Sequence, residues 1–428
     1  MNKKAQTDEQ QWKWPSLSEK ERDRRWRLVK EFMEAQRLDC LVVFGGESRE
    51  RLDRYLTNDR PGGVVIFPLE GELVHLTWAF LDLTSHLEST LRGEASWVRD
   101  LRIGAWGRGI VEVLLEKGYE RANIGVVGLN TVAPYEPEGF VPYRTWVYIL
   151  ANLSHANFRE VSAGFCQLVF VKSDEELQLV RRAAEIGELA AEAMMKATRP
   201  GVSEIEIYAA ATNQLIMNGA RGQSAPAGHI MSIHSGPDNL SWGAPAWLYR
   251  GQAPRVVKNG DVVQAEIFSF YAGMEAQLQM SIAIEPVDSV TRECAVVARN
   301  SYDAGLKALR PGRRFGEVVE AMEKPLRQAK AWNLTPLIHS LNPLYLAGTR
   351  GREILNLPGI EVYKSVGGYK GVIPLADADV EIKAGTVWQL EPNACIGKHR
   401  VNIGGTVIVT DEETIELNIL PKEMRLVC

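Results

Sequence analysis

The first part of the chain alternates between helical and strand-like spacing of its apolar residues. Residues 18–37 have a charged helical pattern that leads directly into the apolar run at 38–44. Further strand-like runs lie at 63–67, 73–77 and 123–127, and helical stretches lie near 80–91, 108–117 and 142–152. This alternation predicts an α/β domain. A less patterned connection follows at 153–170.

A long amphipathic segment marks the start of a second predicted domain. In VKSDEELQLVRRAAEIGE, Ser173 and Glu176 have the spacing of a helix-capping box, and Pro200-Gly201 ends the helical pattern. We therefore predict two domains, at 1–165 and 166–428.

The second domain contains a predicted β-hairpin. In VVQAEIFSFYAGMEAQLQMSIAIE, Ala272-Gly273 is a turn signal between two β-rich runs. Alternate residues of a strand face the same side, both here and in the later run WQLEPN. Within each strand, Gln264 therefore shares a face with Glu266, Gln277 with Gln279, and Gln389 with Glu391. Buried polar groups need hydrogen-bond partners, so a ligand can complete these pairs. Alternatively, the glutamines satisfy one another.

Composition narrows the class of protein. The chain has 428 residues, 45% of them hydrophobic, which is enough for two or three domains. Its net charge of -5 gives no support for binding nucleic acid or an anionic membrane. The first residues lack the apolar core of a signal peptide, and no apolar run reaches membrane-spanning length. Five scattered cysteines without a CxxC pair fit a reducing compartment. We predict a cytoplasmic protein.

Several short motifs, taken in order, resemble the two-domain branch of the creatinase, prolidase and aminopeptidase P superfamily. The motifs are RYLTND (54–59), PGVSEIEI (200–207), SGPDN (235–239), KNGDVV (258–263), AGLKALRPG (304–312), LEPN (390–393) and TVIVTDEE (406–413). The resemblance implies an α/β creatinase-like N-terminal domain followed by an α+β catalytic domain with the "pita-bread" fold. It also implies a homodimer.

The resemblance also implies where metal ligands would stand. Superfamily members hold two metal ions with two hairpin aspartates, a histidine and two later carboxylates. The aspartate positions hold Glu266 and, eleven residues later, Gln277. The histidine falls on His339, and the two later carboxylates fall on Glu391 and Gly404. Amides bring no charge to a hard cation, so these residues argue against the usual metal pair.

Other positions depart from the family pattern or leave its alignment open. An alternative alignment places VGGYKG (366–371) in the histidine segment, which then has no histidine. The family's substrate-facing histidine, seven residues after the SG turn, falls on Gly243 beside Trp242, and the hairpin glutamate of creatinase falls on Gln279. Four basic residues of the stretch before Glu391 belong to a solvated loop or, as a minority option, capture a substrate carboxylate: Arg350, Arg352, Lys364 and Lys370.

From these residues we expect a creatinase-like hydrolase, or a lyase, that acts without a metal on a C–N bond of a small non-peptide molecule. Glu391 is expected to be the general base, His339 its partner acid, and Glu266 a second carboxylate. The expected substrate-binding residues are Gln277, Gln279, Gln389 and Trp242. One alternative is an Xaa-Pro-type metallopeptidase with a single labile metal at Glu266, His339 and Glu391. The other is a catalytically silent binding protein.

Overall fold

A computed structural model describes residues 14–45, 51–59, 62–94, 96–131, 139–221, 231–348 and 378–427. The chain forms two compact units. One spans Ser16–Glu175 and includes Pro343–Tyr345, and the other contains Glu176–Asn342 and Leu346–Cys428. The boundary therefore lies at the beginning of helix α8 (Asp174–Ala197). Within the described ranges, no helix is both long and apolar enough to cross a membrane.

The first unit is an α/β domain on a six-stranded sheet with the strand order β4-β3-β2-β1-β5-β6. Strand β1 pairs antiparallel with β2 and parallel with β5. The strands are β1 (Cys40–Phe44), β2 (Gly63–Pro68), β3 (Val74–Thr77), β4 (Asp100–Ile103), β5 (Asn123–Val127) and β6 (Asn157–Glu160). The helices are α2 (Glu19–Gln36), α3 (Asp53–Thr57), α4 (Phe80–Leu91), α5 (Gly107–Glu116), α6 (Tyr143–Asn152) and α7 (Ser162–Phe170).

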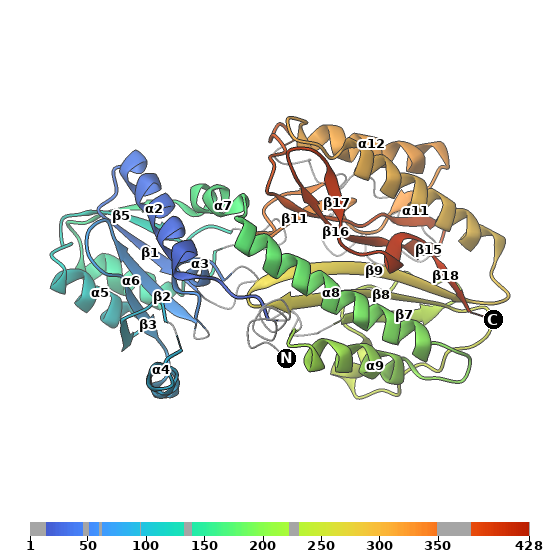
Figure 1. The fold of residues 1–428 in the computed structure, drawn as a ribbon, viewed down its shortest axis with the longest axis horizontal. Helices are drawn as coiled ribbons and strands as arrows, with labels where there is room; N and C mark the ends of the chain where they lie inside the picture. The colour runs from blue at the N-terminus through green and yellow to red at the C-terminus, as the bar shows by residue number, and fades with distance from the viewer. Residues whose placement is uncertain are drawn as a thin grey trace, which may run out of the picture. The chain divides into compact units, whose positions relative to one another are not determined.

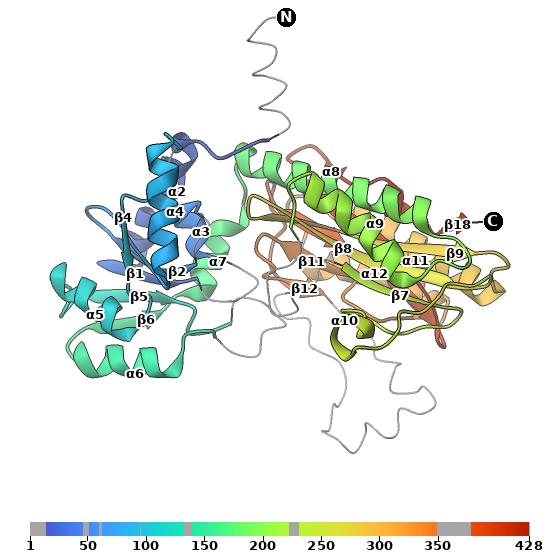
Figure 2. The ribbon, with the colours of Figure 1, turned by 90° about the horizontal axis from the view of Figure 1, so that it is seen from below.

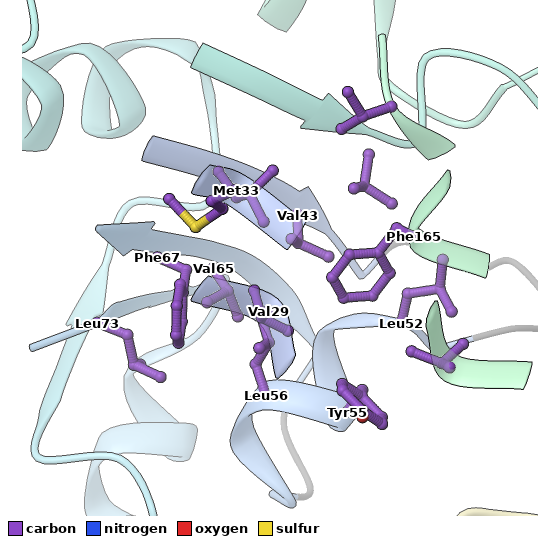
Figure 3. Close-up of a cluster of buried hydrophobic side chains, with 14 of the residues drawn as sticks. Val29, Met33, Val43, Leu52, Tyr55, Leu56, Val65, Phe67, Leu73 and Phe165 are labelled. Atoms are coloured by element: carbon purple, nitrogen blue, oxygen red, sulfur yellow. The ribbon is translucent and has the colours of Figure 1, made fainter. Parts of the chain in front are cut away.

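A buried hydrophobic cluster holds one face of this sheet against its helices. Helix α2 begins at the cap Ser18, whose side chain accepts from the Glu21 backbone N–H, and it buries Val29 and Met33. Figure 3 shows these two side chains beside Val65 of β2, with Phe165 of α7 in the same cluster. The apolar residues at helical spacing in 18–37 therefore form the buried face of α2.

Four elements of the first unit lie where the sequence indicates no regular structure, namely the short helix α3, strands β4 and β6, and helix α7. Strands β4 and β6 are half-exposed or exposed along most of their length, so their sequences DLRI and NFRE carry no apolar run. Helix α7 has the sequence SAGFCQLVF, which is apolar almost throughout and therefore shows little helical periodicity.

The second unit is built on a nine-stranded sheet, ordered β12-β11-β13-β16-β9-β8-β7 with β17 beside β16 and β18 beside β9. Its strands are β7 (Met231–Gly236), β8 (Val262–Tyr271), β9 (Met274–Ile284), β11 (Ile338–Leu341), β12 (Ala347–Gly348), β13 (Val387–Leu390), β16 (Gly404–Val409), β17 (Thr414–Glu416) and β18 (Arg425–Val427). A smaller sheet contains β10 (Trp332–Asn333), β14 (Asn393–Ile396) and β15 (His399–Asn402).

Helices cover the large sheet. Besides α8 they are α9 (Glu204–Met217), α10 (Ala246–Arg250), α11 (Ser289–Ala308), α12 (Phe315–Gln328) and the short 3-10 helix η2 (Leu420–Lys422). In Figures 1 and 2, α8 runs along β8 and β9, and α11 lies beside α12. Helix α8 packs closely, because Gly187 faces the side chains of Leu278 and Ser269. An α/β domain followed by a sheet domain with helices packed on it is the predicted fold class.

Candidate active site

The β8–β9 hairpin forms where the sequence predicts it. Ala272 and Gly273 make the turn with φ angles of 46° and 90°. The resulting register places Glu266 directly opposite Gln279. Directly opposite residues of an antiparallel pair present their side chains on the same face, so these two lie together.

The polar face of the hairpin is the one turned away from helix α8. Leu278 and Ser269 contact α8 at Gly187, so the alternation along β9 sends Gln277 and Gln279 to the opposite face. All of these side chains are buried, with Gln277 and Gln279 at most 1% exposed. A polar pair so deeply buried is stable only when its hydrogen bonds are completed.

Strands β13 and β11 bring further polar residues to this face. The ring of Trp388 stacks on Phe315 of α12, with 5.3 Å between the ring centroids. Its neighbours Gln389 and Glu391 consequently point away from the helices. His339 of β11 is paired directly with Gln389. The side chains of His339 and Gln389 therefore lie on the same face of the sheet.

Gln279, Glu391 and His339 form a connected group. The amide nitrogen of Gln279 donates to Glu391 Oε2. On the other side, His339 Nε2 lies 3.7 Å from Glu391 Oε1. His339 Nδ1 is 2.9 Å from the carbonyl oxygen of Ser340, which can only accept, so Nδ1 carries a proton. The neutral imidazole therefore turns the lone pair of Nε2 toward Glu391. A proton can therefore be held either by Glu391 or by His339 Nε2.

The glutamines present specific atoms for recognition. Gln277 donates its amide nitrogen to Glu275 Oε1 at 2.7 Å, as Gln279 does to Glu391, and a carboxylate fixes which end of the amide faces it. The Oε1 atoms of both glutamines have no hydrogen-bond partner. Gln389 is the reverse, since its Nε2 has no partner. Its Oε1 lies 3.2 Å from Thr406 Oγ1, whose single hydroxyl proton is shared with the Gln277 carbonyl oxygen at 2.9 Å.

The unpaired atoms show which groups a ligand could bind. Each buried polar atom without a partner costs about 1–3 kcal/mol, so the face is incomplete without a ligand or water. Gln277 and Gln279 each donate one of their two amide N–H bonds to a carboxylate and leave Oε1 as an acceptor without a partner. Gln389 leaves its amide nitrogen as a donor without a partner.

Trp242 lies near a buried arginine. Its half-exposed indole ring is 5.2 Å from the guanidinium carbon of Arg400, and Arg400 Nη2 donates to the carbonyl oxygen of the adjacent Ser241 at 2.9 Å. The backbone of Arg400 is held by Gln264, whose amide nitrogen lies 2.5 Å from the Arg400 carbonyl oxygen. This contact places β15 against the polar face of β8.

Comparison with known proteins decides the family. A model of metallopeptidase family M24 matches residues 178–411, which is more than half of the chain. The chain belongs to family M24. A Bacillus creatinase is 19% identical over 327 residues, covering 73% of this chain and 72% of that protein. The Bacillus subtilis peptidase YqhT, described as uncharacterized, is 22% identical over 284 residues, with coverage of 66% and 71%.

Solved structures confirm the pita-bread fold of this M24 protein. The X-Pro aminopeptidase of Thermotoga maritima has a TM-score of 0.71 at 15% identity, with 94% of this chain and 99% of that chain covered. The Xaa-Pro dipeptidase of Bacillus anthracis has a TM-score of 0.70 at 18% identity, with coverage of 95% and 100%. Both the family resemblance and the fold class predicted from the sequence are therefore correct. At these identities the structural likeness shows the fold alone.

The M24 fold implies a pair of metal ions, and the residues of this chain do not fit one. Two of the five ligand positions that the resemblance implies hold Gln277 and Gly404 instead of carboxylates. At Gly404 there is no room for a side chain, because a Cβ would lie 2.2 Å from the Leu390 carbonyl oxygen and 2.9 Å from Glu391 Cα. The backbone of the neighbouring strand has occupied the space that a bridging carboxylate requires.

A single ion at Glu266, His339 and Glu391 is not preformed either. In the part of the chain that the structure describes, no three His, Cys, Asp or Glu side chains are grouped so that they could hold an ion. One oxygen of Glu391 already accepts from Gln279. We therefore derive no chemistry from a metal ion.

Some predicted positions carry other contacts or lie outside the described residues. At the position of the family's substrate-facing histidine, Gly243 has φ 85° and its carbonyl oxygen lies 2.9 Å from His234 Nε2. The alternative histidine segment at 366–371 and the basic residues Arg350, Arg352, Lys364 and Lys370 lie outside the described residues.

Two residues of the site were missed in the sequence. Glu275 is next to the hairpin turn, where a carboxylate is usually solvated, yet here it is 2% exposed and accepts from Gln277. Arg400 stands in a Lys-His-Arg run that resembles a surface turn, yet it is 1% exposed. Alternation from Asn402 could have indicated that Arg400 faces inward, but only the pairing of β14 with β15 establishes that this segment is a strand.

Proposed function

We propose that this chain is a hydrolase that cleaves a C–N bond of a small organic molecule without a paired metal centre. The observation that carries the proposal is the Gln279–Glu391–His339 group, in which an amide and an imidazole contact one buried carboxylate. A carboxylate and an imidazole side by side can exchange protons with a substrate. Membership of family M24 supports a hydrolytic enzyme.

Hydrolysis would proceed by proton transfer through this group. Glu391 accepts a proton from water, and the water oxygen forms the new bond to the carbon of the substrate. As the C–N bond breaks, the nitrogen takes the proton, which His339 Nε2 can hold in between. His339 is oriented for this role by its Nδ1–H bond to Ser340. The same base could instead remove a C–H proton in an elimination, so the lyase form of the proposal uses the same residues.

The unpaired amide atoms indicate what the substrate presents. Gln277 Oε1 and Gln279 Oε1 would accept N–H donors of the substrate, and Gln389 Nε2 would donate to an acceptor. Amides, ureas and amidines carry N–H groups beside such an acceptor. The developing negative charge on the acceptor would be stabilised by the Gln389 donor, as in an oxyanion hole.

The alternative is an Xaa-Pro-type peptidase that uses one labile ion. It is favoured by the structural similarity to an Xaa-Pro dipeptidase. It is also favoured by the proximity of His339 Nε2 to Glu391. Metal analysis separates the two candidates. The proposed enzyme should purify with well under one tightly held transition metal per chain, and a chelator should leave its turnover largely unchanged. Stoichiometric metal with loss of turnover on chelation would establish the peptidase.

The direct test is Glu391→Gln. It keeps the size and hydrogen bonding of the side chain but removes the base, so kcat should fall about a hundredfold or more. The assay is a screen of small amides, ureas, amidines and Xaa-Pro dipeptides that follows release of the amine. The control Glu381→Gln changes an exposed residue of the same unit and should leave kcat unchanged. Normal turnover in Glu391→Gln, with folding intact by circular dichroism, would refute the assignment.

A further inference from the structure

Arg400 is a buried cation without a carboxylate partner in the described chain. The residue is 1% exposed, and its Nε and Nη1 groups have no hydrogen-bond partner. Its remaining contacts are the Nη2 bond to the Ser241 carbonyl oxygen and the ring of Trp242. Burial lowers the pKa of Arg400 to about 10, which shows how far desolvation works against this charge. Buried charges are normally paired.

The geometry of the guanidinium selects the kind of ligand that fits. Its N–H groups form two forks, one from Nε and Nη2 and one from Nη1 and Nη2. Nη2 has two hydrogens and Ser241 takes one of them. Whichever hydrogen is taken, one complete fork of two parallel donors remains. Two parallel N–H groups match the two oxygens of a planar carboxylate.

The backbone of Arg400 is anchored beside the polar face of the proposed active site. Its strand β15 is fixed to β8 through Gln264, which is two residues from Glu266 on the same face. Gln264 and Glu266 are therefore roughly 7 Å apart along β8, which is within the length of a small molecule. Gln264 also has an unpaired Oε1.

We infer that Arg400 binds a carboxylate of the substrate, so that the substrate class is a carboxylic acid that also carries the scissile C–N bond. The identity of the ligand as substrate rests on the proposed function, whereas the anion subsite itself does not. Trp242 would cover one face of the guanidinium, and the free fork would hold the acid group at a fixed distance from Glu391. A substrate without the carboxylate should lose this anchoring and show a raised KM.

Carboxylate binding can be measured without knowing the reaction. The melting temperature of the full chain is followed in sodium acetate, succinate and glycinate, with sodium chloride at matched ionic strength as reference. A ligand that binds only the folded state raises the melting temperature as its concentration rises. The wild type should respond to carboxylates beyond the chloride reference. Arg400→Met should weaken the apparent Kd by at least about tenfold. Arg400→Lys, which keeps the charge but loses the fork, should weaken it as well.

The sign of the stability change separates a binding role from a structural one. Without a carboxylate present, Arg400→Met removes an uncompensated buried charge, so its melting temperature should equal or exceed that of the wild type. Arg292→Met is the control, because Arg292 is 47% exposed and pairs with Glu285, and it should keep the full carboxylate response.

Two results would overturn the inference: no carboxylate response in the wild type, or a full response in both Arg400 variants. Neither result bears on the Glu391→Gln test. Conversely, carboxylate binding that depends on Arg400 in a protein that hydrolyses nothing would refute the proposed function and leave the subsite standing.

Discussion

At the residue scale, Gly404 shows that the bridging carboxylate which the family resemblance implies at this position has no room. A missing carboxylate could in principle be restored by one substitution. Here the Leu390 carbonyl oxygen stands 2.2 Å from where a Cβ would be. The loss of the ligand is therefore built into the contact between β13 and β16, and the amide at Gln277 is only a part of it.

Gly404→Ala should lower the free energy of unfolding by about 1–3 kcal/mol, because the new methyl group meets backbone that cannot move without disturbing the strand pair. Chemical denaturation measures the change. Gly405→Ala is the matched comparison and should cost less, since its Cβ would meet the side chain of Asn418 at 3.1 Å and no backbone atom closer than that. Gln277→Asp combined with Gly404→Glu should lose stability and gain no manganese affinity. Tight manganese binding by that double variant would show that the strands can separate.

The sequence allowed part of this site to be predicted, and the limit is physical. Strand alternation is periodic, so it correctly placed Gln277 with Gln279 and Gln389 with Glu391 on one face. The direction of an amide depends on the partner that its side chain meets, which strand alternation does not encode. The unpaired Oε1 atoms of Gln277 and Gln279 therefore could not be predicted from the sequence. Arg400 was missed for the same reason, because its burial comes from residues distant in the chain.

At the element scale, the β8–β9 turn fixes the register on which the site depends. Both turn residues have positive φ, which suits the right-handed twist of a hairpin but strains any residue with a Cβ. Ala272 is thus the poorer of the two turn residues, although the Ala-Gly pair was enough for the sequence to predict the hairpin.

Replacing Ala272 with Asn should raise the free energy of unfolding by up to about 1 kcal/mol, because Asn tolerates the left-handed conformation better than Ala. Ala272 is exposed, so no packing contact is lost. Thermal unfolding checks this. Gly273→Ala, at φ 90°, should act in the opposite direction. A destabilised Ala272→Asn protein would mean that the turn does not adopt these angles in solution.

At the scale of the whole molecule, both units bury polar groups that lack a hydrogen-bond partner. The second unit buries the glutamine face and Arg400, and the first buries a histidine. His75 of β3 is 0% exposed, and neither of its ring nitrogens has a hydrogen-bond partner. Burial lowers its pKa below the usual value, against the opposing influence of Asp53 and other nearby carboxylates. Acid sensitivity of folding should therefore have a component in the first unit, away from the catalytic residues.

The sign of that component follows from proton linkage. Above the ordinary histidine pKa of about 6.5 both folded and unfolded states leave His75 neutral, and the residue contributes nothing to the pH dependence. Below this pH His75 is protonated in the unfolded state, whereas in the folded state it stays neutral. Stability should then fall by up to about 1.4 kcal/mol per pH unit until the lower folded pKa is reached.

His75→Leu tests this linkage directly. The variant removes the titrating group and two unpaired nitrogens while keeping an apolar side chain in the core, so its stability at pH 7 should be close to that of the wild type or above it. Between pH 6.5 and pH 5 its free energy of unfolding should decline less steeply than that of the wild type. Denaturant unfolding at a series of pH values measures both slopes. His155→Leu is the control, because His155 is exposed in the same unit, and its slope should match the wild type. Parallel slopes for His75→Leu and the wild type would mean that the buried imidazole takes up its proton as easily in the folded state as in the unfolded one.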